Sequence, residues 1–128
     1  MQALSWYMRL WRMELKSMDN RKNDAYYFSK IVEDINTIKK YLNNASYEEF
    51  LTDGQMIDAI MFRMIQLVES IKNVSIIFKD EHPDINWHKI IGFRNGIVHE
   101  YGKTDYIIVY ETITNDLDVL KELFERYL

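Results

Sequence analysis

The segment 94–101 holds the residue types that could do chemistry. Its order is Arg94-Asn95-Gly96-Ile97-Val98-His99-Glu100-Tyr101. An imidazole can move a proton near neutral pH, and a guanidinium can hold a phosphate group while negative charge builds on it. Those are the two groups needed to cleave RNA without a metal ion, and here they stand within two helical turns of each other.

The spacing of apolar residues predicts the helices that position this segment. One apolar stripe predicts a helix from Asp24 to about Leu42, and a second predicts a helix over residues 55–78. Between them, Ser46 and Glu49 have the spacing of a capping box that opens a short helix. A further helix is expected over residues 86–101, and a last one begins at Thr104 or Asp105. Four principal helices with short links predict an all-α, up-and-down bundle of four to five helices.

The helical periodicity also arranges the residues within segment 94–101. Arg94 falls in the middle of an apolar stripe, Tyr101 lies nearly above it, and Asn95 and His99 share the flank of that stripe. An unpaired buried charge is very costly, so Arg94 needs a partner. Arg94 could pair with a buried carboxylate such as Glu69 and simply tie the bundle together. Alternatively, the stripe is a subunit interface where Arg94 reaches a polar groove.

Two further residues of the segment allow a structural and a functional interpretation. A single histidine beside an apolar face, such as His99, is commonly a satisfied structural residue rather than a catalyst. Gly96 costs about 1 kcal/mol relative to alanine inside a helix, which is tolerated where another backbone or a ligand must come close. It could equally relax the helix before its end.

Length and composition limit the other possibilities. The 128 residues suffice for one domain, contain no cysteine, and carry a net charge of −4. No apolar run is long enough to span a membrane, and the missing cysteines agree with a cytoplasmic location. His82 and His88 do not have metal-ligand spacing, and there is no glycine-rich phosphate loop. We therefore expect neither a metal site nor a cofactor.

The first twenty residues differ from the rest of the chain. Residues 1–22 have a net charge of +3, which leaves −7 for residues 23–128, so any RNA site would be a local patch. The aromatic, amphipathic segment 1–20 could be a helical extension, the result of a start codon placed upstream of Met18, or a membrane-surface helix. We predict one domain over residues 21–128, preceded by this N-terminal extension.

The stretch from about Asp24 to Leu128 resembles the HepT-like ribonuclease toxins of the HEPN superfamily. The resemblance rests above all on segment 94–101, on Glu69, and on three further stretches: Ser46-Tyr47-Glu48-Glu49-Phe50-Leu51, His82-Pro83-Asp84-Ile85-Asn86-Trp87, and Val109 with Asn115-Asp116-Leu117. It covers roughly four-fifths of the chain. One departure is Val68, where relatives often have a small residue.

The resemblance implies a helical bundle that forms a homodimer and brings two Arg-x4-His motifs together at the interface. It implies a metal-independent endoribonuclease in which Arg94 and His99 are catalytic and in which Asn95 and Glu69 support them. The implied partner is a minimal nucleotidyltransferase antitoxin of the MNT type, in a type VII-like toxin–antitoxin pair. In such pairs the antitoxin transfers AMP to a tyrosine at the position of Tyr101 and silences the toxin.

A second function stays open at this point. The chain could be a non-catalytic helical module that binds the nucleotidyltransferase and helps it to hold a substrate. The pairing of Arg94 with His99 favours the enzyme, whereas the acidic body favours the binding module.

Overall fold

A computed structural model describes residue 9, residues 23–100 and residues 105–128, with side chains for all of these except 94, 95 and 97–100. Every regular element in this part of the chain is helical, as predicted. The elements are α2 (Asp24–Leu42), α3 (Tyr47–Thr52), α4 (Gly54–Asn73), α5 (Ile76–Glu81), α6 (Trp87–Glu100), α7 (Tyr106–Glu111), the π-helical turn η2 (Thr112–Asp116) and α8 (Leu117–Glu125).

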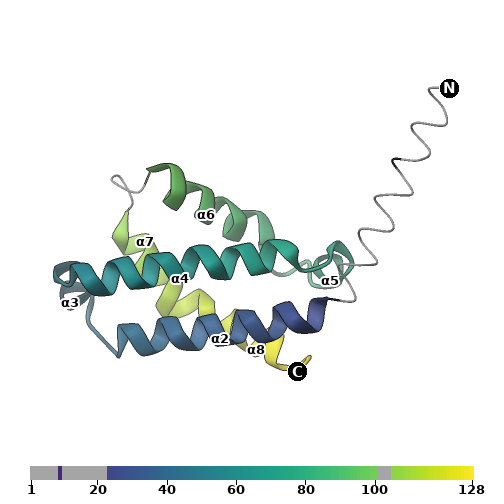
Figure 1. Ribbon diagram of the computed structural model, residues 1–128, viewed down its shortest axis with the longest axis horizontal. Coiled ribbons are helices and arrows are strands. Elements are labelled where there is room, and N and C mark those ends of the chain that lie inside the picture. Colours follow the sequence, from purple (N-terminus) through teal and green to yellow (C-terminus); the bar gives the residue numbers. More distant parts are fainter. Residues whose placement is uncertain (1–8, 10–22, 101–104) are drawn as a thin grey trace.

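The long helices form the expected bundle. In Figure 1, α2 and α4 run side by side across the molecule, α6 lies along the other side of α4, and α8 lies against α2. The interior between them is apolar, and several of its side chains are fully buried: Ile31, Ile35, Ile38, Ile60, Met61, Met64, Leu67, Ile71, Ile113 and Phe124. Among the described residues, no helix has both the length and the apolar character needed to cross a membrane.

The boundaries of α2 follow from local hydrogen bonds. At its start, the buried carboxylate of Asp24 accepts a hydrogen bond from Ser75 N at 2.8 Å and one from Ser75 Oγ at 2.6 Å. At its end, Asn43 and Asn44 adopt positive φ angles of 48° and 59°, a backbone region that asparagine tolerates better than most residues. These two asparagines turn the chain toward α3.

Polar caps define the short helices that link the long ones. Glu49 N donates to Ser46 Oγ at 3.1 Å, and Ser46 N donates to Glu49 Oε1 at 3.3 Å, so the predicted capping box is confirmed. Asp53 then caps α4, because its carboxylate accepts from Met56 N at 3.0 Å.

The prediction of one continuous helix over residues 55–78 is wrong. Helix α4 ends at Asn73, and Ser75 opens the separate helix α5 by accepting a hydrogen bond from Phe78 N at 3.2 Å. A serine hydroxyl competes with the helix ladder for backbone donors. Here Asp24 also binds Ser75 from α2, which stabilises the break.

The predicted last helix is confirmed: it runs without interruption through α7, η2 and α8, and Asp105 caps its start, because its carboxylate accepts a hydrogen bond from Ile107 N at 3.1 Å. The π-helical turn over residues 112–116 inside this helix was not predicted. The hydroxyls of Thr112 and Thr114 donate back to the carbonyl oxygens of Ile108 and Tyr110 at 2.7 and 2.9 Å. Tyr127, expected on the apolar stripe, follows the end of α8 and is 47% exposed.

One buried ion pair joins α2 to α4. Asp34 is only 3% exposed, and its Oδ1 accepts a hydrogen bond from Arg63 Nη1 at 3.0 Å. Its other oxygen, Oδ2, is buried and accepts no hydrogen bond from any of the described residues. Burial raises the pKa of Asp34 above its ordinary value of 3.8, although the bond from Arg63 opposes that shift.

Candidate active site

The start of α6, the helix that carries segment 94–101 apart from Tyr101, is held by two side chains. Asn86 Oδ1 accepts a hydrogen bond from Lys89 N at 3.0 Å and so caps the first turn. The indole of Trp87 donates to the carbonyl oxygens of Lys79 and His82 at 3.2 and 3.1 Å. Trp87 also packs against the core, so it anchors the start of α6. The first turn of α6 is therefore tied to α5.

Beyond this anchor, α6 is only partly enclosed. It lies against α4, and Ile90 and Phe93 pack against the core cluster, but both are only half-buried, as is Ile91. The inward residues of α2 and α4, in contrast, are mostly buried completely. Part of the apolar surface of α6 is therefore accessible to another molecule.

The predicted catalytic residues Arg94 and His99, together with Asn95, lie in this helix. The structure describes the backbone of these three residues and not their side chains. Residues five positions apart in an α-helix lie about 140° apart around the axis and about 7.5 Å along it. The backbone therefore puts Arg94 and His99 on different faces of α6.

The other two predicted site residues are Glu69 and Tyr101. Glu69 is half-buried on α4, with its Oε1 atom inside, and α4 is the helix that packs against α6. Its pairing with Arg94 stays a prediction. Tyr101 lies outside the described residues, and so does its predicted modification.

The glycines of α6 face open space. A Cβ atom built at Gly92 or at Gly96 meets no atom within 4 Å, and both residues are exposed. No described part of this chain lies within 4 Å of a Cβ at Gly96, which leaves room there for a close contact. The alternative, that Gly96 relaxes the helix, also agrees with this geometry.

Among the residues that the structure describes, no group of three or more His, Asp or Glu side chains is placed to hold a metal ion. His82 instead lies 2.9 Å from the hydroxyl of Tyr127, with Nε2 as its contacting atom.

Sequence reasoning assigned no role to a cavity beside α6, which four polar side chains line: Asp84, Asn86, Lys89 and Asp116. Lys89 and Asp116 line it, from α6 and from η2. Asp116 belongs to a stretch shared with the HepT-like proteins, but Lys89 carries no sequence signal. Only the fold brings them together.

An all-helical bundle with this motif on its penultimate long helix is the arrangement of a HEPN-type protein. The family model described as ribonuclease HepT-like matches residues 31–127, so the chain belongs to this family. It is similar to a probable ribonuclease HepT of Thermococcus cleftensis, with 29% identity over 83% of this chain and 96% of that protein. It is also similar to a putative RNase of Caldanaerobacter subterraneus subsp. tengcongensis, with 26% identity over 84% of this chain and 96% of that protein.

A third relative is a putative RNase of Methanocaldococcus jannaschii, with 25% identity over 84% of this chain and 98% of that protein. No solved structure matches the chain.

Proposed function

We propose that this protein is an endoribonuclease that cleaves RNA without a metal ion and acts as the toxin of a toxin–antitoxin pair. The observation that carries the proposal is the motif Arg94-x4-His99-x-Tyr101 in a chain that belongs to the ribonuclease HepT-like family. Relatives named as ribonucleases align along more than four-fifths of the chain.

In this mechanism His99 moves the proton. It removes the proton from a ribose 2′-hydroxyl, whose oxygen attacks the adjacent phosphorus, and the imidazolium form protonates the leaving 5′-oxygen. The products are a 2′,3′-cyclic phosphate and a 5′-hydroxyl. Positioned proton transfer of this kind contributes about 10²–10⁴ to the rate.

Arg94 stabilises the charge that develops on the phosphate oxygens as the phosphorus becomes pentacoordinate. Loss of one such electrostatic contact typically lowers kcat by about 10²–10³. Asn95 orients His99 or the phosphate, and Glu69, on the neighbouring helix, supports Arg94. All four roles rest on the resemblance to the HepT-like family.

Two copies of the chain form the site in this proposal. Arg94 and His99 start from different faces of one α6, about 140° apart, so a second copy offers a simple way to bring both groups to one phosphate. The half-buried apolar residues of α6 provide surface for such a contact. The proposed assembly is a homodimer.

The proposed regulation acts on Tyr101. An antitoxin of the nucleotidyltransferase type transfers AMP to its hydroxyl, and the added phosphate comes within reach of Arg94 and obstructs RNA. Intact-mass measurement after coexpression with the neighbouring gene tests this step. An unmodified chain, or an adduct on another residue, rejects Tyr101 as the target.

The cleavage proposal is tested with RNA in the presence of EDTA, using the full chain and the variants Arg94→Ala and His99→Ala. We expect the full chain to cleave RNA with chelator present and each variant to lose at least about a hundredfold in rate. Cleavage that disappears with EDTA rejects metal independence, and cleavage that survives both substitutions rejects the assigned residues.

The net charge of −7 on residues 23–128 favours a second function, a non-catalytic module that binds the nucleotidyltransferase. A basic surface is the usual electrostatic sign of nucleic-acid binding. If the full chain leaves RNA intact but forms a stable complex with the nucleotidyltransferase, this second function replaces the first.

A further inference from the structure

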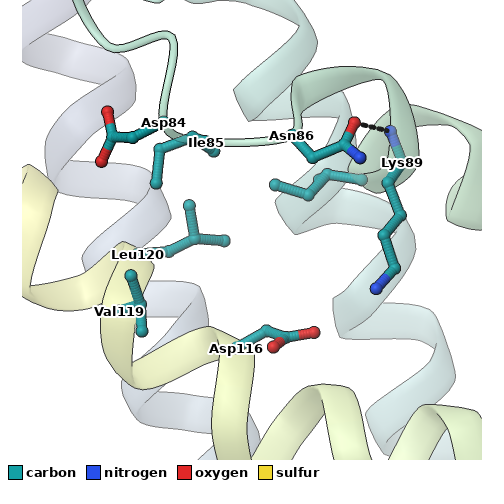
Figure 2. A pocket seen from close by; sticks show the side chains of 8 residues that line it. Asp84, Ile85, Asn86, Lys89, Asp116, Val119 and Leu120 are labelled. Atoms are coloured by element: carbon teal, nitrogen blue, oxygen red, sulfur yellow. Dashed lines mark hydrogen bonds between the residues drawn. The ribbon is translucent and has the colours of Figure 1, made fainter.

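A cavity of about 180 Å³ opens between the start of α6 and the helices η2 and α8. Figure 2 shows its wall: Ile85, Val119 and Leu120 on one side, and Asn86 and Lys89 on the other, with Asp116 below. Val119 is 56% exposed and marks its outer edge.

A second cavity of about 220 Å³ lies next to the first and shares four of its residues, Lys89, Ile90, Asp116 and Leu120. It adds the side chains of Phe93, Ile108 and Thr112, so most of its wall is apolar. An apolar cavity of about 150 Å³ is enough to hold a benzene ring. The two cavities together form a slot, bounded by these residues, that is large enough for a flat ring system.

Three charged side chains line the slot: Asp84 lines the first cavity alone, and Lys89 and Asp116 line both cavities. Within the described part of the chain, neither Lys89 nor Asp116 makes a side-chain ion pair or hydrogen bond. Asp116 ends the π-helical turn η2, and such turns are frequent at functional sites. A carboxylate acceptor and an ammonium donor are thus both available to a molecule inside the slot.

We propose that this slot binds one nucleobase of the RNA, guanine in preference to the others; the inference rests on the proposed ribonuclease function. The apolar walls suit the faces of the ring, and aromatic rings such as that of Phe93 stack on bases. Guanine presents two neighbouring N–H donors that a single carboxylate accepts together, and an oxygen that an ammonium group can reach. No other common base offers a carboxylate that donor pair.

The acidic body of the protein is compatible with this recognition. A base is neutral, so the negative charges that repel a phosphate do not oppose its entry into the slot. The helix that lines the slot also carries Arg94. Phe93 and Ile90 precede Arg94 by one and four residues, which corresponds to about 1.5 and 6 Å along the helix axis. A nucleotide whose base fills the slot therefore has its phosphate within reach of the motif.

Binding is measured without cleavage, on the full chain carrying His99→Ala, by titration with each of the four nucleoside 5′-monophosphates. Methyl NMR follows Ile85, Ile90 and Ile108 at the slot, with Ile38 and Ile60 in the α2–α4 core as internal references. We expect guanosine monophosphate to shift the slot methyls at lower concentration than the other three. Equal responses to all four, or shifts confined to other methyls, overturn the proposal.

Two pairs of variants locate the interaction. Asp116→Asn keeps the shape but removes the carboxylate, and should weaken guanosine monophosphate binding roughly tenfold, the effect of one charge-assisted hydrogen bond. Glu122→Gln, which changes an exposed carboxylate on α8, the helix that directly follows η2, should leave binding unchanged. Val119→Phe should block the slot, whereas Val119→Ala should keep it open. Unchanged binding in both Asp116→Asn and Val119→Phe overturns the proposal.

Cleavage mapping separates this inference from the proposed function. With His99 present, we expect cuts next to guanine, and Asp116→Asn should lose that preference while it still cleaves. Guanosine monophosphate binding without RNA cleavage rejects the ribonuclease function and keeps the slot. RNA cleavage whose base preference is the same in wild type and in Asp116→Asn rejects the slot as a guanine site and keeps the ribonuclease function. Slot methyls that respond to protein concentration instead of nucleotide identify an interface between copies, which also overturns the proposal.

Discussion

The α2–α4 pair and helix α6 are packed in different ways. Inward side chains of α2 and α4, such as Ile35 and Ile60, are completely enclosed. On α6, Ile90 and Phe93 are half-buried, and Gly92 and Gly96 face open space. The inward side chains of α2 and α4 are thus fully buried within one chain, whereas those of α6, the helix that carries Arg94 and His99, are buried only in part.

This difference separates stability from function in the molecule. The free energy of folding comes largely from burial of apolar surface, which α2, α4 and α8 supply. Helix α6 needs only one buried side to be held in place. Its remaining surface is open to a second copy, to RNA or to a protein partner. Substitutions in the two regions should therefore differ in kind as well as in size.

The largest effect is expected in the framework. Ile35→Ala removes a fully buried side chain between α2 and its neighbours, and should lower the free energy of unfolding by about 2–5 kcal/mol through lost burial and the cavity left behind. Urea unfolding measures it. Ile76→Ala is the matched control, because Ile76 is 63% exposed and its loss should change stability by less than about 0.5 kcal/mol. Similar losses in both variants would contradict the description of the framework.

The sequence predicted this framework well because apolar periodicity reports burial directly. Nearly every residue on the predicted stripes of α2 and α4 is buried, and Ser46 with Glu49 form the expected cap. The break between α4 and α5 escaped prediction for a physical reason. Ser75 opens α5 by accepting a hydrogen bond from Phe78 N, but Asp24, fifty-one positions earlier, also holds Ser75 by accepting two hydrogen bonds from it, and no local pattern encodes that second contact.

The second prediction concerns that contact. Asp24→Ala leaves the backbone N–H and the hydroxyl of Ser75 without their acceptor in a buried position. Each such unsatisfied group costs about 1–3 kcal/mol, so the loss should be comparable to that of Ile35→Ala or somewhat smaller. Urea unfolding again gives the value.

Asp24→Asn is the matched control for this contact. Its amide oxygen can still accept from Ser75 N, and its NH₂ group can donate to Ser75 Oγ, so the loss should be smaller than in Asp24→Ala. An equal loss in the two variants would show that charge, and not hydrogen bonding, holds α5 to α2.

The third prediction uses the buried pair Asp34–Arg63 in the framework. Because burial raises the pKa of Asp34 in the folded protein, the folded form takes up its proton before the unfolded chain does as the pH falls. The contribution of this carboxyl to stability therefore rises as the pH falls through the folded pKa, and is complete below 3.8, its ordinary value. Wild type should gain stability relative to Asp34→Asn between about pH 7 and pH 4.5.

Urea unfolding of both proteins at the two pH values measures this change. Arg63→Ala should widen it, because the guanidinium is what opposes the raised pKa of Asp34. A difference between wild type and Asp34→Asn that is independent of pH would contradict the raised pKa.

For the candidate site, the sequence supplied the residue types but not their surroundings. The motif is readable because Arg94, His99 and Tyr101 lie close together in the sequence, in the segment on which the resemblance to the HepT-like proteins mainly rests. The slot beside it was not readable, because Lys89 and Asp116 are distant in the chain and meet only when η2 lies against α6. A partner surface cannot be read from periodicity either, since an apolar stripe does not say which molecule covers it.

The smallest effect on stability, and the sharpest contrast with the framework, is expected on α6. Gly96→Ala adds a Cβ that meets no described atom within 4 Å, and alanine has a higher helix propensity than glycine. The single chain should therefore gain about 0.5–1 kcal/mol in its free energy of unfolding, the opposite sign from every framework variant. If a second copy packs its backbone close to Gly96, the same methyl group should weaken the dimer and lower ribonuclease activity. Sedimentation and RNA cleavage, compared with Gly54→Ala at the equally open start of α4, separate these effects. A gain in stability with unchanged association would show that Gly96 only relaxes the helix, and that the subunit contact lies on another face of α6.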